Sequence, residues 1–425
     1  MNSVNRIAML SVHTCPLAVL GGKKTGGMNV YVRELSRELG RRGIKVDVYT
    51  RSQNPCIPHV NDTLGENARV IHIPCGPEIP LDPDEIYPHL PEFVRNVKTF
   101  ASTEDIHYDL IYSHYWLSGL VAHELRADWA VPVAQMFHTL GMMKDRIVNE
   151  ATERPVTLRA FNEADIMSWV DRIIAATPAE RAQMLWLYRA NRRTIEVVPP
   201  GVDTNRFRPI PSVAAKRELG LPVDQRMLLF VGRIEPLKAV DTIFQAMAIL
   251  KQDAPHLLDN LCISIIGGDP DTNDEPEMVR LKELRDSLGL GDLVMFLGAK
   301  DQDTLNYYYA ASEALIMPSD YESFGMVALE AMASGTPVIA SETGGLAFLV
   351  RDNVTGFLVP VRDPQMLSEK IRLILEKPEE RNRLGHDAHL IAQEYAWTHI
   401  ADRLLAVFAT IIPGHELTTS ASPSA

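Results

Sequence analysis

The feature that most constrains the fold is an alternation of short β-branched segments with helical segments, which runs through the chain twice. In the first half the strand-like segments are residues 7–12, 46–50, 70–73, 110–113, 133–137, 173–176 and 195–198. In the second half they are residues 227–231, 261–266, 294–296, 314–317 and 337–340. Such alternation predicts parallel sheets with helices on both faces, and ligands bound beyond the carboxyl ends of the strands. We therefore expect an α/β protein with two doubly wound domains.

A proline-rich stretch divides the chain into two similar halves and predicts a linker near residues 200–212. The chain has 425 residues, which exceeds the size at which a single hydrophobic core keeps growing. We expect an N-terminal domain over residues 1–205 and a C-terminal domain over residues 206–395. A helix near residues 396–412 is expected to pack back on the first domain, and the Ser/Thr/Pro-rich residues 413–425 are expected to be disordered.

Charge and hydropathy exclude several classes of partner. A net charge of -13 argues against nucleic acid, because binding a phosphate backbone needs a basic face. The apolar runs are too short to cross a bilayer and the first residues lack a secretory pattern, so we expect no transmembrane segment and a cytoplasmic location. The four cysteines, Cys15, Cys56, Cys75 and Cys262, lack metal-ligand spacing, and we expect buried free thiols.

The first candidate binding feature is the pair Gly26-Gly27, which follows the first strand and opens an amphipathic helix. Glycines let backbone N–H groups approach a phosphate closely at a helix N-terminus, where the helix dipole also favours negative charge. The pair matches neither the P-loop nor the GxGxxG pattern. Glycines at such a place also serve helix-to-sheet packing, so the residues alone leave both interpretations open.

Two cations follow the first strand of the second half. Arg233 comes directly after this strand, and Lys238 lies five residues further on, beyond a proline. Two cations at this spacing can converge on a leaving diphosphate without a metal. The alternative is a solvated basic pair.

The strongest candidate feature is a strand, loop and helix over residues 314–333. Glu322 lies in the loop, and residues 325–327 begin the helix with N–H groups that have no partner inside it. Glu330 lies about one turn into the helix, where a carboxylate can accept hydrogen bonds from both hydroxyls of a ribose. The apolar neighbours of Glu330 argue against an ordinary exposed helix glutamate.

No metal site is evident. Residues 269–273 alternate like a calcium loop, but position six is Asp274 rather than Gly and position twelve is Arg280 rather than Glu. No Asp-x-Asp constellation joins metal ligation to a diphosphate site. We therefore expect that the protein requires neither a metal nor a cofactor.

Together these motifs resemble the retaining glycosyltransferases of family 4, which have the GT-B fold, from Arg6 to about Ala401. The resemblance is carried by Thr25-Gly26-Gly27, His138-Thr139-Leu140, residues 199–203, Gly232-Arg233 with Lys238, residues 322–325 with Glu330, residues 335–340 and Gly344-Gly345. It implies two Rossmann-like domains facing across a cleft. It also implies a hexosyltransferase of the EC 2.4.1 type, in which the acceptor attacks the donor sugar from the face that the diphosphate leaves and configuration is retained.

The resemblance further implies roles for individual residues. Arg233 and Lys238 would hold the diphosphate with Gly27, Glu330 would bind the ribose, and Glu322 would bind hydroxyls of the donor sugar. His138 would lie close to the anomeric carbon, so the expected catalytic set is His138, Glu322, Arg233 and Lys238. The expected nucleotide-sugar site consists of Gly26, Gly27, Arg233, Lys238, Lys300, Glu322, Ser323, Phe324, Gly325, Met326, Val327 and Glu330.

Segments near the acceptor resemble two branches of the family. His13-Thr14 and residues 26–31 and 113–119 are similar to enzymes that transfer N-acetylglucosamine to inositol phosphate in mycothiol synthesis. Residues 75–77, 86–93 and 138–141 with Lys144 are similar to sucrose-phosphate synthases, whose acceptor is fructose 6-phosphate. Both branches use a phosphorylated acceptor. The expected acceptor residues are His13, Asn29, Tyr115, Thr139, Lys144 and Arg159.

We expect transfer of glucose from UDP-glucose to fructose 6-phosphate, with transfer from UDP-N-acetylglucosamine to inositol phosphate as the alternative. Both branches place a phosphate-binding lysine where this chain has Pro83, which leaves an unphosphorylated acceptor open. Met28 stands where sucrose-phosphate synthases usually have glutamine.

Two functions other than transfer stay open on the same fold, a nucleotide-sugar epimerase and a catalytically silent binding protein. The joint presence of Arg233, Lys238 and Glu322 argues against a silent binder, because binding alone does not require that set. A two-domain dehydrogenase is remote because the GxGxxG pattern is missing.

Overall fold

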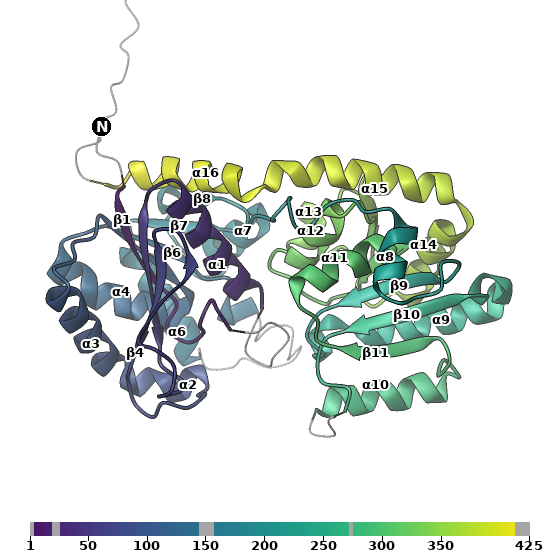
Figure 1. Ribbon diagram of the computed structural model, residues 1–425, viewed down its shortest axis with the longest axis horizontal. Coiled ribbons are helices and arrows are strands. Elements are labelled where there is room, and N and C mark those ends of the chain that lie inside the picture. Colours follow the sequence, from purple (N-terminus) through teal and green to yellow (C-terminus); the bar gives the residue numbers. More distant parts are fainter. Residues whose placement is uncertain (1–3, 19–25, 144–156, 272–274, 413–425) are drawn as a thin grey trace, which may run out of the picture.

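The structure, a computed structural model, describes residues 4–18, 26–143, 157–271 and 275–412. Two sheets organise these residues, and each lies at the centre of one half of the molecule (Figure 1). The expected two-domain α/β architecture is confirmed. Lys144 and residues 413–425 lie outside the described part of the chain.

The first sheet has eight strands in the order β3-β4-β2-β1-β5-β6-β7-β8. All of its pairs are parallel except β3 with β4, which is antiparallel. Its strands are β1 (Arg6–Leu10), β2 (Lys45–Arg51), β3 (Val60–Gly65), β4 (Ala68–Ile73), β5 (Leu110–His114), β6 (Val133–Met136), β7 (Arg172–Ala175) and β8 (Ile195–Val197). The helices around it are α1 (Gly27–Arg41), α2 (Pro83–Ile86), α3 (Leu90–Thr103), α4 (Tyr115–Trp129), α6 (Leu158–Trp169) and α7 (Pro178–Leu187).

The second sheet has six parallel strands in the order β11-β10-β9-β12-β13-β14. Its strands are β9 (Arg226–Val231), β10 (Leu261–Ile266), β11 (Val294–Gly298), β12 (Ala314–Met317), β13 (Val338–Ser341) and β14 (Gly356–Val359). The helices of this half are α8 (Ser212–Glu218), α9 (Val240–Asp253), α10 (Pro276–Ser287), α11 (Gln302–Ala311), α12 (Met326–Ala333), α13 (Leu346–Leu349), α14 (Pro364–Glu376) and α15 (Pro378–Ala392). Short 3-10 turns are η1 (Tyr87–His89), η2 (Arg192–Thr194), η3 (Pro236–Lys238), η4 (Pro255–Leu258) and η5 (Gln393–Tyr395).

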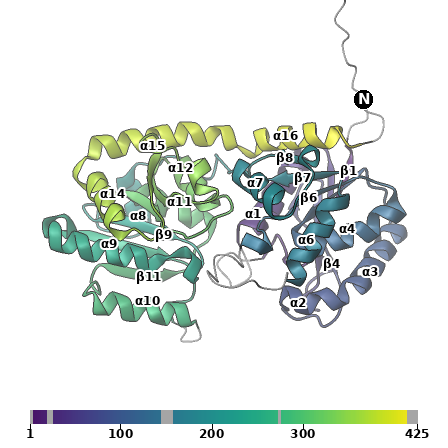
Figure 2. The same cartoon turned by 180° about the vertical axis from the view of Figure 1, so that it is seen from behind.

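The last helix, α16 (Trp397–Ala409), crosses from the second half of the molecule to the first (Figures 1 and 2). It buries Ile400, Leu404 and Phe408, which recur every four residues and form one apolar stripe. Phe408 packs edge-to-face on Tyr112 of β5 with ring centroids 5.2 Å apart. On the rim, Arg42 donates to the carbonyl of Thr398 over 2.6 Å.

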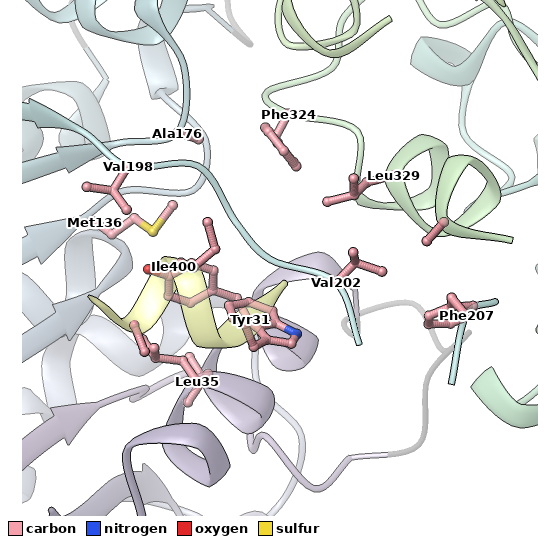
Figure 3. Packing of buried hydrophobic residues seen from close by; sticks show 14 of the residues in the cluster. Tyr31, Leu35, Met136, Ala176, Val198, Val202, Phe207, Phe324, Leu329 and Ile400 are labelled. Carbon is pink, nitrogen blue, oxygen red and sulfur yellow. The ribbon is translucent and has the colours of Figure 1, made fainter. Parts of the chain in front are cut away.

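One apolar cluster runs continuously through both halves (Figure 3). Tyr31 of α1 and Ile400 of α16 belong to the part of the cluster in the first half of the molecule, while Phe324 and Leu329 belong to the part in the second half. Val202 of the linker lies between the two groups, and the linker is fixed by a bridge from Val202 to Ala396. The halves therefore share a core as well as two chain crossings.

The expected strands are confirmed within one or two residues at their ends, but two strands and two cysteines differ from expectation. β3 is a polar edge strand in which only Leu64 is buried, so it lacks an apolar pattern. β14 has four residues and follows a tight turn. Burial is confirmed for Cys75 and Cys262, whereas Cys15 is partly exposed and Cys56 is exposed in the loop after β2; all four are free.

Candidate active site

The candidate residues follow the carboxyl ends of strands in both sheets, where a doubly wound fold binds its ligands. His138 follows β6, Arg233 follows β9 and Glu322 follows β12. The starts of α1 and α12 also meet between the halves, because a Cβ added to Gly27 would lie 3.2 Å from Sδ of Met326. The site is thus assembled from both domains.

Lys238 and Glu322 form an ion pair in the structure. Both side chains are 17% exposed, so the pair is partly accessible to a ligand. Arg233 pairs instead with Glu235 over 2.7 Å, and the carbonyl of Glu235 accepts a 2.9 Å hydrogen bond from the backbone N–H of Lys238. Arg233 and Lys238 are therefore anchored on the same turn, each with a carboxylate partner.

The loop that carries Glu322 rests on Gly344-Gly345. The N–H of Gly345 donates to the carbonyl of Glu322 over 2.7 Å. A Cβ on Gly345 would lie only 2.2 Å from Cα of Phe324, and one on Gly344 would lie 2.2 Å from the Glu322 carbonyl oxygen. Two side-chain-free residues are thus required here. In the sequence both glycines are notable only as part of the resemblance. Their close contact with the backbone of Glu322 and Phe324 gives them a physical role.

Helix α12 begins after Gly325, which adopts a φ of 102° and serves as its N-cap. This left-handed conformation favours glycine, and it turns the chain from the Glu322 loop into the helix. Ser323 and Phe324 precede this turn, and Phe324 is buried. The N–H groups of Met326 and Val327 open the helix and have no partner within it, so they suit an anionic oxygen.

Glu330 is a buried carboxylate rather than an exposed helix residue. It accepts hydrogen bonds from Nε2 of Gln302 and from the hydroxyl of Tyr309, each 3.0 Å long. Burial raises the pKa of Glu330 to about 7, although both donors oppose this shift. A carboxylate can accept about four hydrogen bonds, so Glu330 retains room for ribose hydroxyls. Nothing in the sequence pattern pointed to Gln302 or Tyr309 as its partners.

Gln302 also ties Glu330 to the first domain. Its amide oxygen accepts hydrogen bonds from Arg33 of α1 and, over 3.1 Å, from Arg206 of the linker. Glu34 of α1 balances the charges of both arginines, 2.8 Å from Arg33 and 3.6 Å from Arg206. A small hollow lies beside this network, lined by Val30, Glu34, residues 201–203, Arg206, Phe207, Gln302, Met326, Glu330 and Trp397.

His138 has an unusual backbone conformation and a neutral ring. Its φ of 63° lies in the left-handed region, which is uncommon for residues other than glycine. Nε2 of His138 is 3.0 Å from Nδ1 of His114. The ring keeps some exposure, yet it is enclosed by packed groups, and this burial lowers the pKa of His138 to about 3. At neutral pH the residue is an uncharged imidazole.

Four of the expected acceptor residues converge next to His138. Arg159 donates to the carbonyl and to the hydroxyl of Thr139 over 2.6 and 2.9 Å. Its guanidinium lies over the ring of Tyr115, 4.7 Å from the centroid. The ring of His13 also contacts Tyr115, with centroids 4.3 Å apart and the ring planes tilted by 38°. Sequence positions 13, 115, 139 and 159 are thus brought together.

Two other expected residues are placed differently. Asn29 is buried, and its amide donates to Thr14 and to the carbonyl of Cys15 while accepting from the N–H of Gly26. It therefore holds the loop after β1 against the start of α1, which is a supporting position. Lys300 is partly exposed after β11, and within the described residues its ammonium has no partner.

The charge of Arg159 is balanced by a glutamate that the sequence analysis did not single out. Glu163 is fully buried and lies 2.7 Å from Nε of Arg159. It also accepts hydrogen bonds from the N–H of Gly141 and the hydroxyl of Tyr188. The spacing of four residues between Arg159 and Glu163 on one helix was the available signal.

Pro83 begins α2 at a position where proline is favoured, because its missing N–H is not needed there. The next residue, Asp84, is close enough to Tyr115 to add to the rise in the pKa of Tyr115 that burial causes. The charge of Arg159 opposes that rise. At this edge of the acceptor region the chain thus presents a carboxylate.

The sequence predicts neither a metal site nor a membrane-spanning segment. Within the four described ranges, no three or more His, Cys, Asp or Glu side chains gather so that they could hold a metal ion. In the same part of the chain, no helix is both long and apolar enough to cross a membrane. The expectation that no metal or cofactor is required stays a prediction.

Almost the whole chain matches known protein families. Residues 25–206 match the family described as Glycosyltransferase Family 4, and residues 213–390 match Glycosyl transferases group 1. The chain is 40% identical to the D-inositol 3-phosphate glycosyltransferase of Geodermatophilus obscurus, across 95% of this chain and 89% of that relative. An enzyme of the same name from Thermobispora bispora is 38% identical, across 95% of this chain and 94% of the relative.

Solved structures show the same architecture. A sucrose-phosphate synthase from Thermosynechococcus elongatus superposes with a TM-score of 0.85 at 34% identity, covering 96% of this chain and 98% of that one. HepE of Anabaena in complex with UDP gives a TM-score of 0.73 at 19% identity, covering 96% and 100%. The second likeness concerns the fold alone.

Proposed function

Because this chain belongs to family 4 of the glycosyltransferases, retaining enzymes of the EC 2.4.1 type with the GT-B fold, we propose that it transfers N-acetylglucosamine from its UDP derivative to inositol phosphate. Relatives named D-inositol 3-phosphate glycosyltransferase support this acceptor. They favour inositol phosphate, the alternative expected from the sequence, over fructose 6-phosphate, the acceptor expected first. Transfer of glucose to fructose 6-phosphate is the second candidate, because the sucrose-phosphate synthase is also similar along the whole chain.

The observation that carries the proposal is the convergence of Arg159, Thr139 and Tyr115 beside His138. A guanidinium and two hydroxyls from separate segments are the donors that a phosphate monoester prefers. Thr139 directly follows His138 in the chain. A phosphate bound at Thr139 would therefore be close enough to His138 for one small acceptor to reach both the phosphate site and the reacting sugar. An unphosphorylated acceptor would make no use of this set of donors, in which Glu163 already balances the charge of Arg159.

In the proposed reaction the leaving diphosphate is stabilised by Arg233, Lys238 and the first amides of α12. Lys238 exchanges its contact with Glu322 for the diphosphate, and Glu322 becomes available to hydroxyls of the donor sugar. Cations and N–H groups fixed where negative charge develops can contribute about 3 to 4 kcal/mol each to lowering the barrier. His138, being neutral, contributes a hydrogen bond near the anomeric carbon rather than a positive charge.

The test is a matrix of donors and acceptors with nucleotide release and product mass as readouts. UDP-N-acetylglucosamine, UDP-glucose and their ADP and GDP counterparts would each be combined with inositol phosphate, fructose 6-phosphate, inositol and fructose. We expect the highest rate with UDP-N-acetylglucosamine and inositol phosphate. Conversion of the donor sugar without any acceptor would indicate an epimerase. Binding without turnover would indicate a silent binder, and rates with inositol equal to those with inositol phosphate would refute the phosphate site.

Tyr115→Phe should raise the KM for inositol phosphate about tenfold to a hundredfold, because a hydrogen bond to a charged phosphate contributes roughly 1.5 to 3 kcal/mol. The phenyl ring keeps its contact with Arg159, so the fold and the KM for the donor should change little. Steady-state kinetics with each substrate varied in turn measure both effects. Arg159→Leu is less suitable, since it leaves Glu163 buried without its cation. An unchanged acceptor KM in Tyr115→Phe would contradict the assignment.

The affinity for UDP-N-acetylglucosamine should rise about tenfold between pH 6 and pH 8. The pKa of Glu330 is raised to about 7, and ribose hydroxyls donate hydrogen bonds to the ionised form. Binding is therefore weakened below pH 7, where Glu330 is protonated, and is fully developed above it. Calorimetric titration measures the Kd, and the diphosphate diester of this ligand does not itself titrate in the range. The Glu330→Gln variant should bind more weakly with a flat pH profile; a steep profile in that variant would exclude Glu330 as the cause.

A further inference from the structure

His114 is a buried residue to which neither the resemblance nor the proposed reaction gives a role. It ends β5, while His138 lies two residues beyond the end of the neighbouring strand β6. The two rings meet through Nδ1 of His114 and Nε2 of His138, 3.0 Å apart. The His114 ring is completely buried. Tyr112 lies against it with a centroid separation of 4.3 Å, and Tyr31 lies 5.5 Å from it.

A hydrogen bond between two neutral imidazoles needs one proton, and only one of the two nitrogens can carry it. If His138 donated from Nε2, His114 would accept at Nδ1 and carry its own proton on Nε2. That nitrogen is buried and has no hydrogen-bond partner among the described residues. If His114 donates from Nδ1, its Nε2 carries only a lone pair. A buried N–H without an acceptor is the rarer and costlier defect, so the second arrangement is favoured.

We propose that His114 is a positioning residue, which donates from Nδ1 to Nε2 of His138 and thereby holds His138 as the tautomer protonated on Nδ1. The hydrogen bond at one ring nitrogen decides which nitrogen carries the proton. His138 then offers an N–H donor at Nδ1 to an oxygen of the donor sugar. It cannot accept the proton of the acceptor hydroxyl at Nε2, which His114 already occupies.

The backbone of His138 makes this support necessary. Its left-handed φ of 63° is uncommon for a residue other than glycine, so a regular strand backbone does not orient the partly exposed side chain. Tyr31 contacts the ring edge-to-face with centroids 5.3 Å apart, which restrains its plane but leaves the choice of nitrogen free. His114 is the polar contact of the ring in the described part of the chain. The inference rests on the proposed function only in placing the donor sugar beside His138.

The first test needs no substrate. Nitrogen NMR of the full chain labelled at histidine reports which nitrogen of each ring is protonated, and the signal of His138 is assigned by its absence in His138→Gln. We expect His138 to be protonated on Nδ1 at pH 7. Protonation on Nε2 in the unmodified protein would overturn the proposal, whatever the acceptor of the enzyme proves to be.

The second test compares two substitutions. His114→Asn keeps an N–H close to the position of Nδ1, whereas His114→Leu removes it. We expect His114→Leu to lower kcat about tenfold, to change the KM for the nucleotide-sugar less than threefold and to give His138 signals from both tautomers. His114→Asn should restore most of the rate and the Nδ1 tautomer. Tyr112→Phe, which keeps the ring packed on His114 and removes only the hydroxyl that contacts Tyr31, should stay within threefold.

Retention of both kcat and the His138 tautomer in His114→Leu would refute the role. Thermal unfolding shows whether His114→Leu is folded. If it is not, the tautomer of His138 in His114→Asn tests the proposal alone. If folded His114→Asn loses the Nδ1 tautomer of His138, the asparagine amide does not replace the donor of His114. That result would also count against the proposal.

Discussion

Lys238→Ala is expected to lower kcat/KM by about a hundredfold while the protein stays folded. An ammonium fixed beside the leaving diphosphate stabilises charge that develops in the transition state, and a hundredfold loss corresponds to about 2.7 kcal/mol, the lower end of the cost of removing one such group. Lys238 stands at the end of η3, held by its backbone hydrogen bond to Glu235, so the cation is preorganised. Initial rates with UDP-N-acetylglucosamine and inositol phosphate, together with the unfolding temperature, measure the two parts of this prediction.

Lys251→Ala is the matched control. Lys251 lies on α9 of the same domain and is exposed, and among the described residues it donates only to the carbonyl of Gly289. It should keep full activity. Glu322→Gln breaks the same ion pair from its other side, and it separates loss of the cation from loss of the pair. A Lys238→Ala variant within about threefold of the unmodified enzyme would remove Lys238 from the diphosphate site.

Gly345→Ala is expected to lower kcat/KM roughly tenfold to a hundredfold through the loop that carries Glu322. Its φ of -72° and ψ of -24° suit alanine, so the backbone conformation itself is not the obstacle. The new methyl group would lie 2.2 Å from Cα of Phe324, and the loop must move to accommodate it. Overpacking of this kind costs about 1 to 3 kcal/mol. The shift displaces Glu322 and the first amides of α12 together, so nucleotide affinity should fall as well.

Gly291→Ala is the control for this substitution. A Cβ there would meet only Asp286, at the ordinary distance of 3.8 Å. Both variants should be assayed for UDP affinity by calorimetry and for unfolding temperature. Normal nucleotide binding in Gly345→Ala would show that the Glu322 loop tolerates displacement, which would contradict its placement in the site.

Sequence reasoning succeeded where local pattern determines structure. Short β-branched runs bounded by turn residues located most of the strands, and the apolar residues around Glu330 predicted its burial correctly. β3 was missed because its exposed polar residues leave no alternation to detect. β14 was missed because four residues after a turn carry too little signal.

The contacts that join distant segments could not be foreseen. Gln302 and Tyr309 reach Glu330 from α11, and nothing near them in the sequence marks that contact. The pairing of Lys238 with Glu322 depends on the neighbouring positions of β9 and β12 in the sheet. His114 lies within residues 113–119, which carry part of the resemblance. Its contact with His138 follows only from the adjacency of β5 and β6. The roles of the site residues stay predictions that the variants above address.

The most direct test of the account is the structure of the product formed from UDP-N-acetylglucosamine and inositol phosphate. Proton NMR of the purified product gives both the acceptor and the anomeric configuration. We predict that the sugar is joined to inositol phosphate with the α-configuration of the donor retained, and that no product forms when inositol replaces inositol phosphate at the same concentration. A β-linked product, or release of free N-acetylglucosamine at the same rate with and without inositol phosphate, would contradict it.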